Sequence, residues 1–202
     1  MRGGRSRGVN RRIACRALAA ACGLLALGPA RAFDPLTSSI GKGVSTALDV
    51  RSKDDVVADV EIDAALSRKL VEQKGDDFGK VSILVFARHG VLVGFARSDD
   101  IRRRAEELAR GEHRLRSLRN DIVVGQAGGS FGHNALLDKK IDLALTTTRG
   151  VRSVNMRWKV YGGDVFITGM AQSSAEANLA VRTVRRIDGV RAVHSSIRVG
   201  QK

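Results

Sequence analysis

The sequence predicts an α+β protein built from two tandem α-β-β-α-β repeats, each a three-stranded mixed sheet covered by two helices. Two observations predict this class. The 202-residue chain repeats itself at an offset of 75 residues, and a fixed offset indicates duplicated structural units. Inside each copy, the spacing of apolar residues switches between the helical period and the alternation typical of a strand.

The duplication is clearest in one pair of segments. "VYGGDVFITGM", from Val160 to Met170, returns 75 residues earlier as "VFARHGVLVGF", from Val85 to Phe95. The offset then holds without a gap to the end of the chain. Identical residues recur at Asp63/Asp138, Leu70/Leu145, Gly75/Gly150, Ala105/Ala180, Ile122/Ile197 and Gly125/Gly200.

Each copy begins with a helix, because Ile62, Leu66 and Leu70, and then Leu137, Ile141 and Leu145, recur at helical spacing. A half-buried strand follows, with alternating apolar and polar residues over 154–161. Gly162-Gly163 suits the positive φ of a hairpin turn, and "DVFIT" returns as the partner strand. An amphipathic helix and an alternating strand complete the copy. We expect Gly169 to let the strand pass closely under that second helix.

The first 32 residues have the layout of a secretory signal peptide. They contain seven arginines and no acid, an apolar run from Ala17 to Ala30, and small residues at Ala30 and Ala32 before Phe33. Cys15 and Cys22 both lie in the part to be removed, so the mature chain is expected to lack disulfides and Cys-ligated metal. Lipidation at Cys22 is the less favoured alternative, because the apolar stretch before it is too short.

The remaining chain divides by composition. Residues 33–54 mix Gly, Ser, Thr and Pro and are predicted to be a flexible leader. The first repeat is expected over residues 55–125 and the second over 135–202. Between them, residues 126–134 form a Gly-rich hinge, which we expect to join two separately folding units.

The hairpin "GGDVFITGMAQS" and the closing "DGVRAVHSSIRV" resemble the BON domain (bacterial OsmY and nodulation). The first copy resembles it less, since Arg88-His89 replace the expected glycine turn. Two copies behind a signal peptide are similar to dual-BON envelope proteins. That resemblance implies a non-enzymatic protein of the Gram-negative periplasm or outer membrane. It also implies association with anionic phospholipid, a role in envelope integrity, and outer-membrane protein assembly as a further role.

One motif suggests an enzyme: "GGSFG", over 128–132, fits G-x-S-x-G, with Asp164 or Asp188 and then His194 in hydrolase order. That motif requires a nucleophile elbow in a large parallel sheet, whereas these residues lie in a Gly-rich linker. The four histidines have no paired spacing for a metal. We therefore predict no catalytic, cofactor-binding or metal-binding residues, and hydrolase activity remains a distant alternative.

Charge distribution directs attention to the second repeat. The formal net charge is +14, but only +7 remains after residue 32. Residues 55–125 contain 13 basic and 13 acidic residues, whereas residues 128–202 contain 12 and 5. An anionic partner would therefore meet the second half. Nucleic acid is disfavoured as that partner, because export separates the chain from it and aromatic residues for stacking are few.

The first helix of the second repeat supplies a candidate site. On the side away from its core stripe it carries Leu136, Lys139, Lys140 and Leu143. An apolar stripe flanked by lysine suits the headgroup boundary of an anionic bilayer, so these four residues are predicted to bind phospholipid. Two alternatives stay open: both leucines pack against the first repeat, or the protein is a chaperone-like scaffold for outer-membrane protein assembly.

Overall fold

The computed structural model describes residues 49–72 and 78–200. All of these residues belong to one compact unit that spans residues 35–202. The predicted signal peptide, both cysteines and most of the leader lie outside the described residues. The last part of that leader is described, and α1 begins in it at Lys53.

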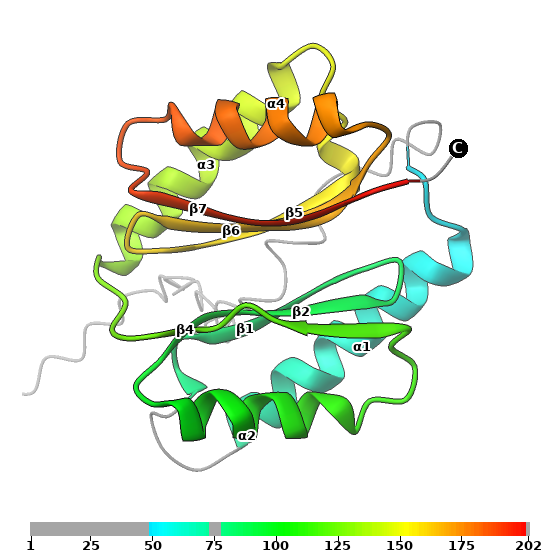
Figure 1. Cartoon of the computed structure of the whole chain (residues 1–202), viewed down its shortest axis with the longest axis vertical. Coiled ribbons are helices and arrows are strands. Elements are labelled where there is room, and N and C mark those ends of the chain that lie inside the picture. The colour runs from blue at the N-terminus through cyan, green and yellow to red at the C-terminus, as the bar shows by residue number, and fades with distance from the viewer. Residues whose placement is uncertain (1–48, 73–77, 201–202) are drawn as a thin grey trace, which may run out of the picture. The chain divides into compact units, whose positions relative to one another are not determined.

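The first repeat has its sheet on one side of two helices (Figure 1). Its elements are α1 (Lys53–Glu72), β1 (Val81–Phe86), β2 (His89–Ala96), α2 (Asp99–Arg110), β3 (Ser117–Asn120) and β4 (Val123–Val124). Strand β2 pairs antiparallel with β1 and parallel with both β3 and β4. The expected third strand is thus divided in two, where Asn120 Oδ1 accepts a hydrogen bond from the Ile122 amide at 3.1 Å.

The second repeat follows the same order. Its elements are α3 (Phe131–Thr147), the short 3₁₀ helix η3 (Ser153–Asn155), β5 (Met156–Tyr161), β6 (Asp164–Ala171), α4 (Ser174–Arg185) and β7 (Ala192–Val199). Strand β6 pairs antiparallel with β5 and parallel with β7. The predicted fold class, two copies of a small mixed sheet covered by helices, is therefore confirmed.

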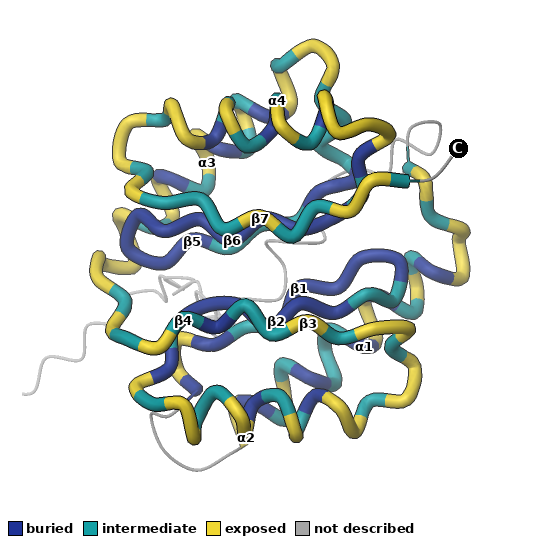
Figure 2. The backbone as a smooth tube through the Cα atoms, viewed as in Figure 1, coloured by how far each residue is buried: buried dark blue, intermediate teal, exposed yellow. Residues whose placement is uncertain are grey.

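Each repeat has its own apolar core between its helices and one face of its sheet. In the first, Ile62, Leu66 and Leu70 of α1 pack with strand residues such as Ile83 and Leu92. In the second, Leu137, Ile141 and Leu145 of α3 pack with Met156, Val160, Val165 and Ile167. Strands β1, β2 and β6 are mostly buried, whereas β3 and β7 are half-buried or exposed and the outer sides of the helices are exposed (Figure 2). The helical and strand periods in the sequence located both cores.

The other faces of the two sheets pack against each other. A third apolar cluster there combines Leu84, Val91 and Val93 of the first repeat with Tyr161 and Phe166 of the second. Phe95 of the first repeat lies edge-on to Phe166, with ring centroids 5.9 Å apart. The second face of each sheet is thus covered by the other repeat, a contact that the sequence did not predict, whereas separate folding of the two repeats stays a prediction.

Polar contacts accompany this cluster. Ser82 Oγ lies 2.6 Å from Tyr161 Oη, and burial raises the pKa of that phenol to about 12. The Arg157 guanidinium lies over the Phe86 ring, 5.5 Å from its centroid. Burial lowers the pKa of Arg157 to about 10, so the group remains a cation at neutral pH. The polar side chains of Ser82 and Arg157, which are typical of a solvated sheet face, therefore contact the other repeat.

The first helix of each repeat holds that repeat's hairpin turn. The buried Asp59 carboxylate accepts hydrogen bonds from the Ala87 and Arg88 amides at 2.8 and 2.6 Å. Both turn residues have positive φ, 52° and 61°, which non-glycine residues rarely adopt. The turn thus consists of Ala87 and Arg88, one residue earlier than predicted. At the equivalent place in the second repeat, Asn134 Oδ1 accepts from the Gly162 amide at 2.7 Å.

Gly169 is needed for a close approach, but to a different element from the one expected. Its φ is 136°, and a Cβ there would lie 2.0 Å from the Asn155 carbonyl oxygen, immediately before β5. The equivalent Gly94 would meet the Lys80 carbonyl oxygen at 2.0 Å. These glycines therefore admit the backbone of the neighbouring strand rather than the second helix.

Candidate functional site

Helix α3 presents one side to the core of the second repeat and the other outward. Ser130 caps its N-terminus, accepting a hydrogen bond from the His133 amide at 3.3 Å. The helix therefore begins at Phe131, inside the predicted hinge 126–134, whose last four residues are helical. A serine just before a run of apolar residues at helical spacing is a start signal that the glycines of this segment obscured.

The predicted site residues share the outward side of α3, which we call the α3 surface: Leu136, Lys139, Lys140 and Leu143. Leu136 is 59% exposed and Leu143 is 66% exposed, and both lysines are exposed as well. The leucines consequently do not pack against the first repeat, which contacts the second through its sheet face instead. Lys140 Nζ lies 3.4 Å from the Asp188 carbonyl oxygen, so one lysine is oriented by the loop after α4.

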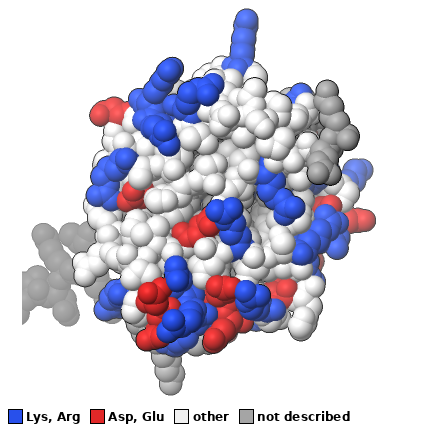
Figure 3. All heavy atoms as spheres, viewed as in Figure 1, with Lys and Arg blue, Asp and Glu red and all other residues white. Residues whose placement is uncertain are grey.

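Charge around the α3 surface is mainly basic. Exposed arginines follow α3 and lie on and after α4: Arg149, Arg182, Arg185 and Arg186. In Figure 3, blue side chains predominate over the half of the molecule that holds α3 and α4, whereas blue and red are interleaved over α2. An anion close to the second repeat would therefore experience a favourable field over more than the two lysines.

Sequence reasoning missed an aromatic side chain on the same helix. Phe131, the first residue of α3, is 72% exposed. The sequence analysis placed Phe131 in the hinge, although the Ser130 before it is a residue that typically caps a helix N-terminus. Exposed residues on α3 therefore include three large apolar side chains, and such side chains gathered on one element indicate an interaction surface.

The first repeat has a different surface at the equivalent positions. Glu61 and Arg68 are exposed there, while Ala64 and Ala65 are half-buried. Glu61 Oε2 lies 3.2 Å from Arg114 Nη1, so its charge is paired. The α3 surface is therefore a feature of one repeat rather than of the duplicated fold.

The residues of the hydrolase-like pattern have structural contacts. Ser130 is the α3 cap described above. Asp164 pairs with Arg191 at 2.6 Å, and the His194 ring stacks on Phe166 at a centroid distance of 4.5 Å. Over residues 49–72 and 78–200, no group of three or more His, Cys, Asp or Glu side chains is placed to hold a metal ion.

No helix within the described ranges has the length and apolar character needed to cross a membrane.

Comparison with known proteins identifies the repeats. The family model described as BON domain matches residues 58–126 and again 133–201. An uncharacterised protein in the gshII 5' region of Anaplasma centrale is 27% identical over 125 residues, which is 60% of this chain and 83% of that protein.

Two solved structures of CdsD, a structural protein of the type III secretion system of Chlamydia trachomatis, are also similar. The C-terminal domain of CdsD is 15% identical, with 69% of this chain and 67% of that one covered. The second CdsD structure is 16% identical, with 68% and 63% covered. Both have a TM-score of 0.30, so neither likeness supports an argument about function.

Proposed function

The chain belongs to the BON domain family, with two copies in tandem, and on that premise we propose that it is an exported, non-enzymatic envelope protein whose second repeat binds anionic phospholipid. BON domains occur in envelope proteins, which supports this setting. The proposal locates the protein in the periplasm, peripheral to a membrane, where it supports envelope integrity. The observation that carries it is the α3 surface: two exposed leucines with two exposed lysines between them.

The chemistry of this surface matches the boundary of an anionic bilayer. The leucines would enter the region between headgroups and acyl chains, and the lysine stems would extend along it with their ammonium groups toward phosphates. Basic residues on α4 add long-range attraction that falls with salt. A solvated basic surface alone would not need exposed leucines, so the leucines support membrane docking.

The structure bounds the strength of this docking. Full burial of a leucine side chain contributes about 1.5–3 kcal/mol. Because Leu136 and Leu143 are already partly covered by the domain, about 60% of that value is available to each. Two lysines near an anionic leaflet add about 1 kcal/mol each. These contributions total about 4–6 kcal/mol, and the cost of association reduces that total, so one site should bind with a Kd no tighter than about 10⁻⁴ M.

Vesicle co-sedimentation tests the proposal. The full chain should pellet with vesicles that contain phosphatidylglycerol and much less with purely zwitterionic vesicles. Leu136→Asp with Leu143→Asp should abolish pelleting, and Lys139→Glu with Lys140→Glu should weaken it most at low salt. The matched control is Val57→Asp with Val60→Asp, which changes two exposed valines on α1 and should leave pelleting intact.

The same experiment separates the alternative function, a chaperone or scaffold for outer-membrane proteins. Exposed leucines would also suit apolar segments of an unfolded client protein. A chain that does not pellet with phosphatidylglycerol vesicles but still delays aggregation of an unfolded β-barrel protein would replace the membrane proposal with this one. Equal pelleting of the leucine variant and the unchanged chain would remove the α3 surface from the membrane proposal.

A further inference from the structure

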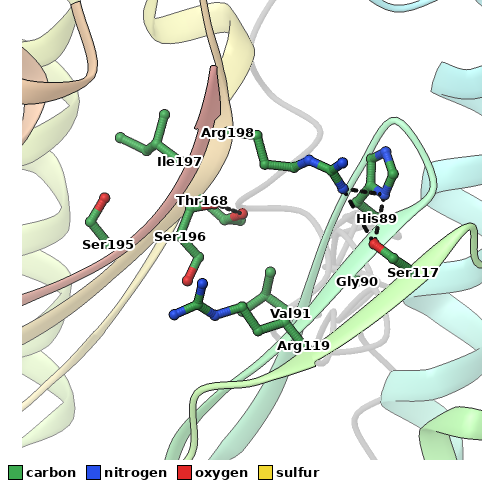
Figure 4. A pocket seen from close by; sticks show the side chains of 10 residues that line it. All are labelled: His89, Gly90, Val91, Ser117, Arg119, Thr168, Ser195, Ser196, Ile197 and Arg198. Carbon is green, nitrogen blue, oxygen red and sulfur yellow. Dashed lines mark hydrogen bonds between the residues drawn. The ribbon is translucent and has the colours of Figure 1, made fainter. Parts of the chain in front are cut away.

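A pocket of about 260 Å³ opens between the two repeats, on the side where β3 and β7 lie. One wall comes from β2 and β3 of the first repeat and the other from β6 and β7 of the second (Figure 4). Its polar lining consists of His89, Ser117, Arg119, Thr168, Ser196 and Arg198, together with the exposed Ser195. The lining thus combines two guanidinium groups and four hydroxyls with an imidazole, and contains no carboxylate.

Because side chains alternate between the two faces of a strand, several polar side chains of the lining point into the pocket. On β7, Ser196 and Arg198 point toward the first repeat, whereas Ser195 and Ile197 point to the other side of the strand (Figure 4). Arg198 extends to His89 and Ser117. Arg119 approaches the pocket from β3, opposite Ser196. Donors therefore reach the pocket from both repeats and from different directions.

The charge of Arg198 is not neutralised by a carboxylate among its described contacts. Its Nη1 lies 2.6 Å from His89 Nδ1 and 3.3 Å from Ser117 Oγ, both uncharged partners when the ring is neutral. Burial first, and then the Arg198 and Arg116 charges, lower the pKa of His89. A protonated His89 would place a second cation against Arg198, so the ring accepts the guanidinium hydrogen bond in its neutral form.

The other charged groups around the pocket are paired. Arg119 Nε lies 2.6 Å from Asp121 Oδ1, and Ser196 Oγ donates to the other oxygen of the same carboxylate. Arg116 pairs with Asp55 at 3.1 Å. With His89 neutral, the set Arg198, Arg119 and Asp121 has a net charge of about +1, which leaves one cation at the pocket without a counter-charge.

We propose that this pocket binds a tetrahedral phosphate-type oxyanion, with Arg198 as its principal charge partner and Ser117 as a hydroxyl donor. The Thr168 and Ser196 hydroxyls, which donate to the Ser196 carbonyl oxygen and to Asp121, would turn to donate to the anion. Guanidinium groups and hydroxyls from several directions match an acceptor with oxygens on all sides, whereas a planar carboxylate would use fewer of them. Inorganic phosphate and the phosphodiester of a lipid headgroup share this chemistry. The site is distinct from the α3 surface, because none of its lining residues lies on α3.

An oxyanion here would also change the protonation of His89. A negative charge beside the ring favours the imidazolium, which could then donate to the anion rather than accept from Arg198. Binding should therefore take up a proton and should tighten as the pH falls through the His89 pKa. Because the anion would contact both β3 and β7, it would also hold the two repeats together.

Nuclear magnetic resonance titration of the full chain with inorganic sulfate tests the proposal, because sulfate keeps its charge over the relevant pH range. The amide signals of Ser117, Arg119, Ser196 and Arg198 should shift together and saturate. Arg198→Met should weaken binding at least about tenfold, as expected for loss of a charge-assisted contact. Asp121→Asn should strengthen it, since it removes the negative charge nearest the pocket. Arg185→Met, which removes an exposed arginine from α4, is the matched control and should leave binding unchanged.

Three outcomes would overturn the proposal: no saturable shift, equal affinity in Arg198→Met and the unchanged chain, or equal losses in Arg198→Met and Arg185→Met. Far-UV circular dichroism of each variant without anion checks that the fold is retained, and the gain expected for Asp121→Asn cannot arise from unfolding. His89→Gln should remove the pH dependence while retaining sulfate binding. Parallel titrations with inorganic phosphate and with glycerophosphoglycerol identify the source, because the tighter ligand points to the free ion or to the lipid headgroup.

Discussion

The aromatic contact between the repeats should contribute measurably to stability. Phe166 is 1% exposed, and its ring meets Phe95 of the other repeat edge-on at 5.9 Å and an interplanar angle of 84°. Phe166→Leu and Phe95→Leu keep most of the apolar volume but remove the aromatic pair. Each should lower the free energy of unfolding by about 1–3 kcal/mol. The double variant should show a coupling of about 0.5–1.5 kcal/mol, the usual contribution of an aromatic pair beyond its buried area.

Urea unfolding provides the assay. Trp158, the single tryptophan, reports by fluorescence on the second repeat, and far-UV circular dichroism reports on both. The two transitions should coincide, because the repeats share a buried cluster. Phe166→Leu with Phe78→Leu is the control, since Phe78 lies in the core of the first repeat and the two changes should be additive. A Phe166–Phe95 coupling below about 0.3 kcal/mol, or separate transitions for the two probes, would refute the reasoning.

Two further predictions concern the first repeat. Asp59→Ala removes the acceptor for the Ala87 and Arg88 amides and should lower the free energy of unfolding by about 2–4 kcal/mol. Asp59→Asn should cause a smaller loss in the same urea titrations. Equal losses for the two variants would show that the hydrogen bonds to the turn do not contribute. The Arg114 hydrogen bond lowers the pKa of Glu112 to about 2, so its contribution to stability is present above about pH 4.5 and is lost as the pH falls toward 2. Arg114→Gln should flatten thermal stability against pH in that window, and an unchanged profile would contradict the assignment.

The fold was predictable where one repeat suffices to define it. The 75-residue offset located the same five elements twice, and Leu137, Ile141 and Leu145 identified the buried side of α3. The side with Leu136 and Leu143 followed directly, because a helix has only one face to place in its core. These parts depend on local periodicity, which a single sequence contains.

The packing of the repeats was not predictable in this way. Polar residues on alternate positions of β5, such as Arg157 and Lys159, are typical of a solvated sheet face. In the structure the first repeat covers that face, and burial of Tyr161 and Phe166 offsets the desolvation of the polar groups. The choice of the two sheet faces that pack together depends on the folded surfaces of both repeats, and the local periodicity of one repeat does not contain it. The hydrogen bonds from Asp59 and Asn134 to the hairpin turns could have been predicted in principle, since these two residues are related by the same offset as Ala87 and Gly162.

The contacts between the sheets are related by that same offset. Ser82 and Arg157 are equivalent positions, as are Phe86 and Tyr161, so the Ser82–Tyr161 and Arg157–Phe86 contacts exchange when the repeats are interchanged. The Ser196–Asp121 hydrogen bond joins two equivalent positions and lies on the axis of this exchange. Such a pattern is an approximate two-fold symmetry of the isologous kind that homodimers use. A covalent connection makes the association intramolecular, so it no longer depends on protein concentration. Fusion also frees each half to diverge, and the exposed leucines of α3 occur in one half alone.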